Sequence, residues 1–174
     1  MKEANSLLLF DSLLEKEIDL AIVRIPENPP LNLTIQHLLD ESLVAVLAEN
    51  YTCTEDIIEL STLKNEIFIT SPDQISPGLH DSILKACSLS GFHPNLKYNA
   101  PQIVSILSLV SAGLGVSLVP ASTQQLKING IKYRHLKDNR ARTSIGLAHA
   151  HDYRSQTAIN FSSLLHSLMH SSAY

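Results

Sequence analysis

The stretch VSAGLGVSLVPASTQ, residues 110–124, contains the end of one helix, a buried strand and the start of a second helix. Gly113 suits the left-handed backbone conformation that often follows the last turn of a helix. Residues 116–119 form an apolar run of strand length. Pro120 can end that strand, and Ser122 can cap the helix that follows it. This order of elements is typical of an α/β fold.

The rest of the chain continues this alternation of helical and strand patterns. We expect helices over residues 7–14, 55–64, 77–90, 103–113 and 158–169, and strands over residues 18–23, 33–39, 43–47, 67–70, 131–136 and 143–148. The unbroken apolar run at 18–23 favours a parallel strand that is covered on both faces. The alternation predicts a parallel or mixed sheet with helices on both sides.

Composition and charge limit the classes of protein that fit. The chain has 174 residues, of which 44% are hydrophobic and 17% charged, as in a globular protein with a substantial core. Its formal net charge is −4, and its 13 Lys and Arg residues are scattered along the sequence. A surface that neutralises DNA phosphates is therefore not expected in this segment alone.

Cysteine use and the N-terminal residues bear on cellular location. Cys53 and Cys87 are far apart and lack a CxxC spacing, which favours reduced thiols over a disulfide framework. The apolar residues 7–10 lie between the acidic Glu3 and Asp11, which argues against a signal peptide. No apolar run reaches membrane-spanning length. We therefore expect a cytoplasmic protein that does not enter a membrane.

Two motifs resemble those of one family. EIDLAIVR at residues 17–24 matches the pattern (I/L)D(L/A)(A/G)xxR, and AGLGVSLVP at 112–120 matches AGxG(I/V)(S/A)LVP. Both patterns are found in the effector-binding domain of LysR-type transcriptional regulators. The continuation PASTQ at 120–124 is similar to the branch that senses benzoate- and muconate-type acids. The resemblance implies two lobes folded like type II periplasmic binding proteins, with a ligand cleft between them and two strand crossovers as the hinge.

The order of the elements suggests where the two lobes divide. We expect residues 1–40 and 138–174 to form the first lobe and residues 41–137 the second, with a crossing at 40–42. Compared with the family, the first lobe is incomplete, because it lacks its first strand, first helix and second strand. The family binds DNA through an N-terminal winged helix-turn-helix, which this sequence does not contain. For the full-length regulator the resemblance implies a homodimer or homotetramer.

The best binding candidate is the predicted helix start at Pro77, Gly78 and Leu79. Free N–H groups and the positive end of the helix can bind an anion there, and Gly78 allows a ligand to approach the backbone closely. An ordinary capped helix is the alternative. The resemblance favours the binding site, because the matching helix start in aromatic-acid sensors contacts the effector carboxylate.

Two further residues are candidates for the same ligand. Ser6 begins the first predicted helix, for which Asn5 or Ser6 is the N-cap; by the resemblance, Ser6 is an effector ligand from the opposite lobe. Arg24 ends the first predicted strand, where open α/β sheets bind their ligands, and its guanidinium can hold a carboxylate bidentately. A surface ion pair of Arg24 with Glu27 or Asp19 is the alternative.

Two histidine pairs have spacings that could chelate a metal. His149 and His151 would share one face of a strand beside Asp152, and His166 and His170 would share one face of a helix. Neither pair has a third-ligand motif such as HExxH, so exposed histidines are the better interpretation. We expect no metal, no cofactor and no catalytic residue.

The sequence therefore predicts a sensor domain that binds a small carboxylate effector to control transcription. Two alternatives stay open at this stage. One is a stand-alone solute-binding protein of the same fold, which would need an export signal. The other is a metal-dependent enzyme that uses the His149 and His151 pair.

Overall fold

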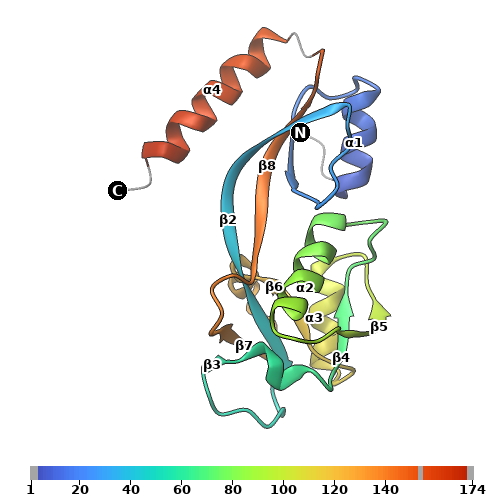
Figure 1. Ribbon diagram of the computed structural model, residues 1–174, viewed down its shortest axis with the longest axis vertical. Helices are drawn as coiled ribbons and strands as arrows, with labels where there is room; N and C mark the ends of the chain where they lie inside the picture. Colours follow the sequence, from blue (N-terminus) through green and yellow to red (C-terminus); the bar gives the residue numbers. More distant parts are fainter. Residues whose placement is uncertain (1–3, 153–154, 172–174) are drawn as a thin grey trace.

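Two long antiparallel strands, β2 (Leu33–Ala48) and β8 (Arg142–Ala150), connect two lobes (Figure 1). The structure is a computed structural model that describes residues 4–152 and 155–171. The first lobe, at the top of Figure 1, holds α1, β1, α4 and the adjoining ends of β2 and β8. The second lobe holds the remaining elements. The two lobes are therefore joined by two neighbouring strands of one sheet.

β2 is one continuous strand where the sequence predicted two. Its pairing with β8 runs from Leu33 opposite Ala150 to Ser42 opposite Arg142, with a bulge between His37 and Leu39. Beyond Ser42 the same strand pairs with β6 and β7. The polar residues 40–42 do not break the strand, because β8 provides hydrogen-bonding partners on that stretch. The predicted crossing at 40–42 thus lies inside a strand.

The first lobe is a small sheet covered by a helix. β1 (Ala21–Arg24) pairs antiparallel with β8, and α1 (Ser6–Leu14) packs against them. Its core consists of Phe10, Leu13, Ala21, Val23, Leu33 and Ala148. α4 (Gln156–Ser171) extends away from this sheet (Figure 1).

The prediction of a parallel strand at 18–23 that is covered on both faces was wrong. β1 starts only at Ala21, is antiparallel to β8, and leaves Ile22 55% exposed. An apolar run does not by itself reveal strand direction, and β1 has a strand partner on only one side within the described residues.

The second lobe is built on the buried half of β2. Its strands are β3 (Ile57–Ile58), β4 (Ile67–Thr70), β5 (Asn95–Asn99), β6 (Ser117–Pro120) and β7 (Ile131–Leu136). Its helices are α2 (Pro77–Leu89) and α3 (Ile103–Ser111), with short 3-10 turns η1 (Leu60–Leu63) and η2 (Ala121–Leu126). Leu43, Ala45 and Leu47 enter one core cluster, whereas Val44 and Val46 enter a second. This half of β2 is thus covered on both faces, which explains the unbroken apolar run at residues 43–48.

Most local predictions in this lobe were confirmed, two helices were wrong, and one strand was missed. α2, α3, β4, β6 and β7 lie where the sequence placed them, to within a few residues. The helix expected at 55–64 is instead β3 followed by η1, and the helix expected after Pro120 is only a 3-10 turn. β5 was not predicted, because only Leu96 and Tyr98 form the inward face of its short sequence NLKYN, and two residues make a weak alternation. Within the described residues, no helix has the length and apolar character needed to cross a bilayer.

The stretch at 110–124 contains the predicted helix end and strand, with a 3-10 turn in place of the second helix, and both of its glycines have a structural role. Gly113 follows α3 with a φ of +75°, the left-handed conformation expected there. Gly115 lies against β4, and a Cβ added to it would be 2.4 Å from the carbonyl oxygen of Ile67. The backbones meet at this point, since Val116 donates to Ile67 and accepts from Ile69, each at 2.8 Å. A side chain at 115 would push these two segments apart.

Gly115→Ala is expected to destabilise the fold by about 1–3 kcal/mol, the cost of forcing an atom into a closely packed site. Urea unfolding followed by circular dichroism measures the change. Leu114→Ala, one residue earlier and 40% exposed, is the control and should cost distinctly less. Equal stability of wild type and Gly115→Ala would show that the approach of Gly115 to β4 is not as close as described.

Candidate ligand-binding site

The first turn of α2 rests on the end of β1. A Cβ added to Gly78 would lie 2.6 Å from the carbonyl oxygen of Arg24 and 3.0 Å from its Cβ. Gly78 is therefore in direct contact with the backbone of Arg24, across the boundary between the lobes. The structure thus brings together two of the residues that the sequence singled out separately.

The start of α2 has backbone groups available to a ligand. Ser76 is the N-cap residue but makes no side-chain capping hydrogen bond, and Pro77 occupies the first turn. No acceptor for the N–H groups of Gly78 and Leu79 is found among the described residues. The Leu79 side chain is 2% exposed and packs into the core, so Leu79 can contact a ligand only through its backbone.

Buried hydroxyl groups lie at the end of the strand that precedes α2. Thr70 and Ser71 are 1% and 3% exposed, and neither hydroxyl has a hydrogen-bond partner among the described residues. Thr143 on β8 is in the same situation, at 1% exposed. Buried hydroxyls of this kind are usually satisfied by protein, water or ligand. None of the three was selected from the sequence as a ligand-binding residue, because burial of a hydroxyl leaves no sequence pattern.

Ser6 is not the cap of α1. The cap is Asn5, whose Oδ1 accepts a hydrogen bond from the Leu8 amide at 2.9 Å. Ser6 is the first residue of the helix and is partly exposed. α1 and α2 lie one above the other on the same side of the β2 and β8 strands in the view of Figure 1. Asn5, and not Ser6, therefore caps the N-terminus of α1.

Arg24 pairs with Glu41 rather than with Glu27 or Asp19. Its Nη2 and Nη1 atoms lie 3.3 and 3.4 Å from Glu41 Oε2, and both side chains are largely buried. The other carboxylate oxygen of Glu41 accepts the Ser122 backbone N–H at 2.7 Å. This chain of contacts connects the end of β1, the crossing on β2 and the start of η2.

The environment of Glu41 keeps it ionised. Burial acts to raise the pKa of Glu41, but the hydrogen bonds from Ser122 and the charge and hydrogen bonds of Arg24 outweigh burial and lower this pKa below its ordinary value. The carboxylate therefore neutralises Arg24 at neutral pH. A ligand carboxylate that approaches Arg24 would compete directly with Glu41.

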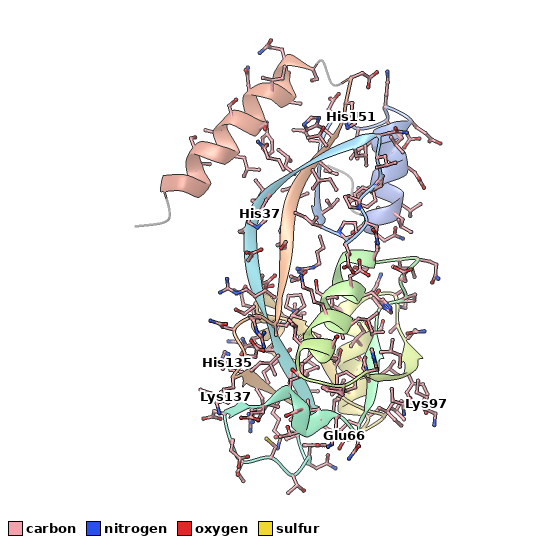
Figure 2. The ribbon with its side chains drawn as sticks, in the orientation of Figure 1. His37, Glu66, Lys97, His135, Lys137 and His151 are labelled. Atoms are coloured by element: carbon pink, nitrogen blue, oxygen red, sulfur yellow. The ribbon has the colours of Figure 1, made fainter. Side chains whose placement is uncertain are left out.

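The histidine pairs do not form a metal site within the described residues. No group of three His, Cys, Asp or Glu residues is close enough there to hold a metal ion. His149 Nδ1 lies 2.9 Å from the Ala150 carbonyl oxygen, and Asp152 forms an ion pair with Lys16. The side chains of His166 and His170 lie outside the described residues. The labelled His37, His135 and His151 lie in separate parts of the molecule (Figure 2).

Cys87 offers no reactive thiol to the site. Cys87 is fully buried in the core of the second lobe, and burial raises the pKa of its thiol to about 12. At neutral pH the thiol is therefore protonated and a poor nucleophile.

Glu41→Gln is expected to destabilise the protein by about 1–2 kcal/mol at pH 7, because Arg24 loses its charged acceptor. Since the pKa of Glu41 is lowered in the folded state, its contribution is present at neutral pH and is lost as the pH falls below about 4.5. Urea unfolding at several pH values should thus show the difference between wild type and Glu41→Gln shrinking in acid. Glu49→Gln, at an exposed position after β2, is the control. A difference that stays constant with pH would contradict the assigned ionisation.

Comparisons with known proteins agree with this architecture. The family model described as the LysR substrate binding domain matches residues 1–169. The regulator BudR of Raoultella terrigena is 28% identical over 160 residues, which cover 91% of this chain and 55% of BudR. CatR of Pseudomonas putida is 31% identical over 148 residues, which cover 85% of this chain and 51% of CatR. The chain thus spans about half the length of these relatives, which are named as transcriptional regulators rather than enzymes.

Solved structures share the fold at low sequence identity. The effector-binding domain of a BenM variant superposes with a TM-score of 0.82 at 22% identity, over 98% of this chain and 80% of that one. Full-length CbnR in complex with its target DNA gives a TM-score of 0.83 at 16% identity, over 97% of this chain and 59% of CbnR. The fold is therefore the two-lobed fold of periplasmic binding proteins, as the sequence predicted. With the family model matching nearly its whole length, this chain belongs to the LysR substrate-binding domain family.

Proposed function

We propose that this chain is the effector-sensing part of a LysR-type transcriptional regulator and binds a small carboxylate between its lobes. The contact of Gly78 with the Arg24 backbone carries this proposal, because it brings the positive end of α2 against the residue that carries the guanidinium group. Both groups attract a negative charge. The contact also means that a ligand at this point touches both lobes.

The proposed ligand contacts follow from the groups present. The backbone N–H groups of Gly78 and Leu79 would donate to a carboxylate, and Arg24 would neutralise it. Pro77 would form part of the wall. Ser6 would contribute its hydroxyl from the first lobe.

Binding would act on the lobe arrangement through Glu41. If Arg24 turns toward a ligand, Glu41 loses one partner and keeps the Ser122 N–H. A ligand shifts the equilibrium between lobe arrangements only by its difference in affinity for them. Replacement of Glu41 by the ligand as the partner of Arg24 provides such a difference in affinity. Arg24 belongs to the first lobe and Ser122, which stays bound to Glu41, belongs to the second.

The chemical class of the effector is inferred from relatives. One BenM effector-binding domain was solved with its effector benzoate, with a TM-score of 0.79 to this chain. From this neighbour we infer that the effector of this chain is an acid of aromatic catabolism, such as benzoate or muconate.

The proposal also includes the limits of the two lobes. The first lobe is proposed to be formed by residues 1–40 and 138–174 and to be incomplete, and the second by residues 41–137. DNA contact is proposed to occur through a helix-turn-helix outside this sequence. Assembly as a homodimer or homotetramer is proposed for the full-length regulator.

Titration calorimetry with benzoate and with cis,cis-muconate tests the site. Arg24→Ala and Ser6→Ala are each expected to weaken binding at least tenfold, through loss of the guanidinium or the hydroxyl. Gly78→Ala should act similarly, because its methyl group collides with the Arg24 carbonyl.

Arg140→Ala is the matched control, since Arg140 is exposed, pairs with Asp138 and is not among the proposed ligand contacts. Circular dichroism of each variant separates loss of binding from loss of folding. Binding that is indifferent to the Arg24, Ser6 and Gly78 changes in folded protein would remove the proposed site.

A further inference from the structure

A separate cavity lies beside the junction of the lobes. Its volume is about 220 Å³, and it does not include Ser6, Arg24 or residues 77–79 in its wall. Three segments line it, namely the loop after β1, the second and third turns of α2 and the start of β8. The lining residues are Ile25, Pro26, Glu27, Asp81, Ser82, Lys85, Arg142 and Ser144. The cavity therefore touches both lobes and a connecting strand.

Two cationic groups in this wall have donors to spare. Lys85 and Arg142 are both exposed, and neither forms an ion pair or side-chain hydrogen bond with any residue in the described part of the chain. Arg142 acts on Asp40 only through its charge. An ammonium and a guanidinium together suit a ligand carboxylate.

The same wall also presents acceptors. Asp81 Oδ2 accepts the backbone N–H of Glu27 at 2.8 Å, which leaves its second oxygen for a ligand. The hydroxyl hydrogen of Ser82 is donated to the Gly78 carbonyl at 2.6 Å, and that of Ser144 to Asp40 Oδ1 at 2.6 Å. These two hydroxyl oxygens can therefore only accept further hydrogen bonds.

The charges of the lining residues cancel. Glu27 and Asp81 balance Lys85 and Arg142, so a simple anion meets two carboxylates and a simple cation meets two positive groups. A molecule that carries both signs satisfies all four residues. The volume suits a small molecule, well below the usual size of pockets for drug-like ligands.

We propose that this cavity binds a small zwitterion of the α-amino acid class, as a second ligand site distinct from the effector site. Its carboxylate pairs with Lys85 and Arg142, and its ammonium group pairs with Asp81 and Glu27. The bound molecule bridges the loop after β1 and α2. It therefore stabilises the lobe arrangement seen here and adjusts the response to the effector.

NMR titration of the ¹⁵N-labelled chain with L-alanine tests this site. The amide of Glu27, which donates to Asp81, is the reporter. Its signal should shift and saturate with L-alanine, and at least tenfold weaker binding is expected for propionate and for ethylamine. Propionate lacks the ammonium group and ethylamine lacks the carboxylate.

Variants locate the binding. Lys85→Ala and Asp81→Asn should each weaken L-alanine binding at least tenfold, and asparagine keeps an acceptor for the Glu27 amide. Lys97→Ala is the control, because Lys97 lies at the far edge of the second lobe (Figure 2).

Equal binding of propionate and L-alanine, or normal binding by Lys85→Ala, would overturn the zwitterion site. Shifts centred on the Gly78 amide would also overturn it, by placing alanine in the effector site. Failure of benzoate and muconate to bind would count against the proposed effector, and it would not affect the test of the zwitterion site.

Discussion

The end of β1 is held by contacts on two sides, and the relative position of the two lobes depends on these contacts. On one side the first turn of α2 rests on the Arg24 backbone at a position where only glycine fits. On the other side the Arg24 guanidinium reaches Glu41, which also accepts the Ser122 amide. A largely buried ion pair costs desolvation and does not guarantee stability, but breaking it leaves a charge without its partner. Arg24 is thus a point at which a change of ion-pair partner can alter the contact between the lobes.

The two connecting strands limit how the lobes can move. Among the elements of residues 4–152 and 155–171, only β2 and β8 continue from one lobe into the other as strands, and they form an unbroken antiparallel pair apart from the bulge between His37 and Leu39. Asp40 lies next to this bulge, where it accepts from Ser144 at 2.6 Å and pairs with His37 at 2.9 Å. The hydrogen bond from Ser144 and then the one from His37 lower the pKa of Asp40. Movement at the hinge therefore has to work against these cross-strand contacts.

The sequence predicted helix ends and core-facing residues best where the signal was local, although the local patterns at 55–64 and after Pro120 gave 3-10 turns in place of helices. Gly113, Pro77 and the apolar face of α2 each report on their immediate neighbours, and the corresponding helix ends and core residues were confirmed. The direction of β1 and the continuity of β2 could not be predicted in this way, because both depend on pairing with β8, more than a hundred residues away. The hydrophobic pattern of β5 was too weak to register as a strand.

The candidate site was only partly visible in the sequence. Gly78 and Arg24 were selected individually, with help from the family resemblance, and the structure shows that they touch. Glu41 and the hydroxyls of Thr70, Ser71 and Thr143 were missed, because their importance comes from burial and from partners distant in sequence.

A distance measurement between the lobes tests the central claim most directly. Spin labels at Leu14 on α1 and Leu89 on α2, both 41% exposed, would be introduced in a Cys53→Ser background and measured by double electron–electron resonance. Saturating cis,cis-muconate is predicted to shift the distances to one narrower population, because the ligand binds where α2 meets β1. An unchanged distance distribution in protein shown by calorimetry to be saturated would contradict coupling between the ligand and the lobes.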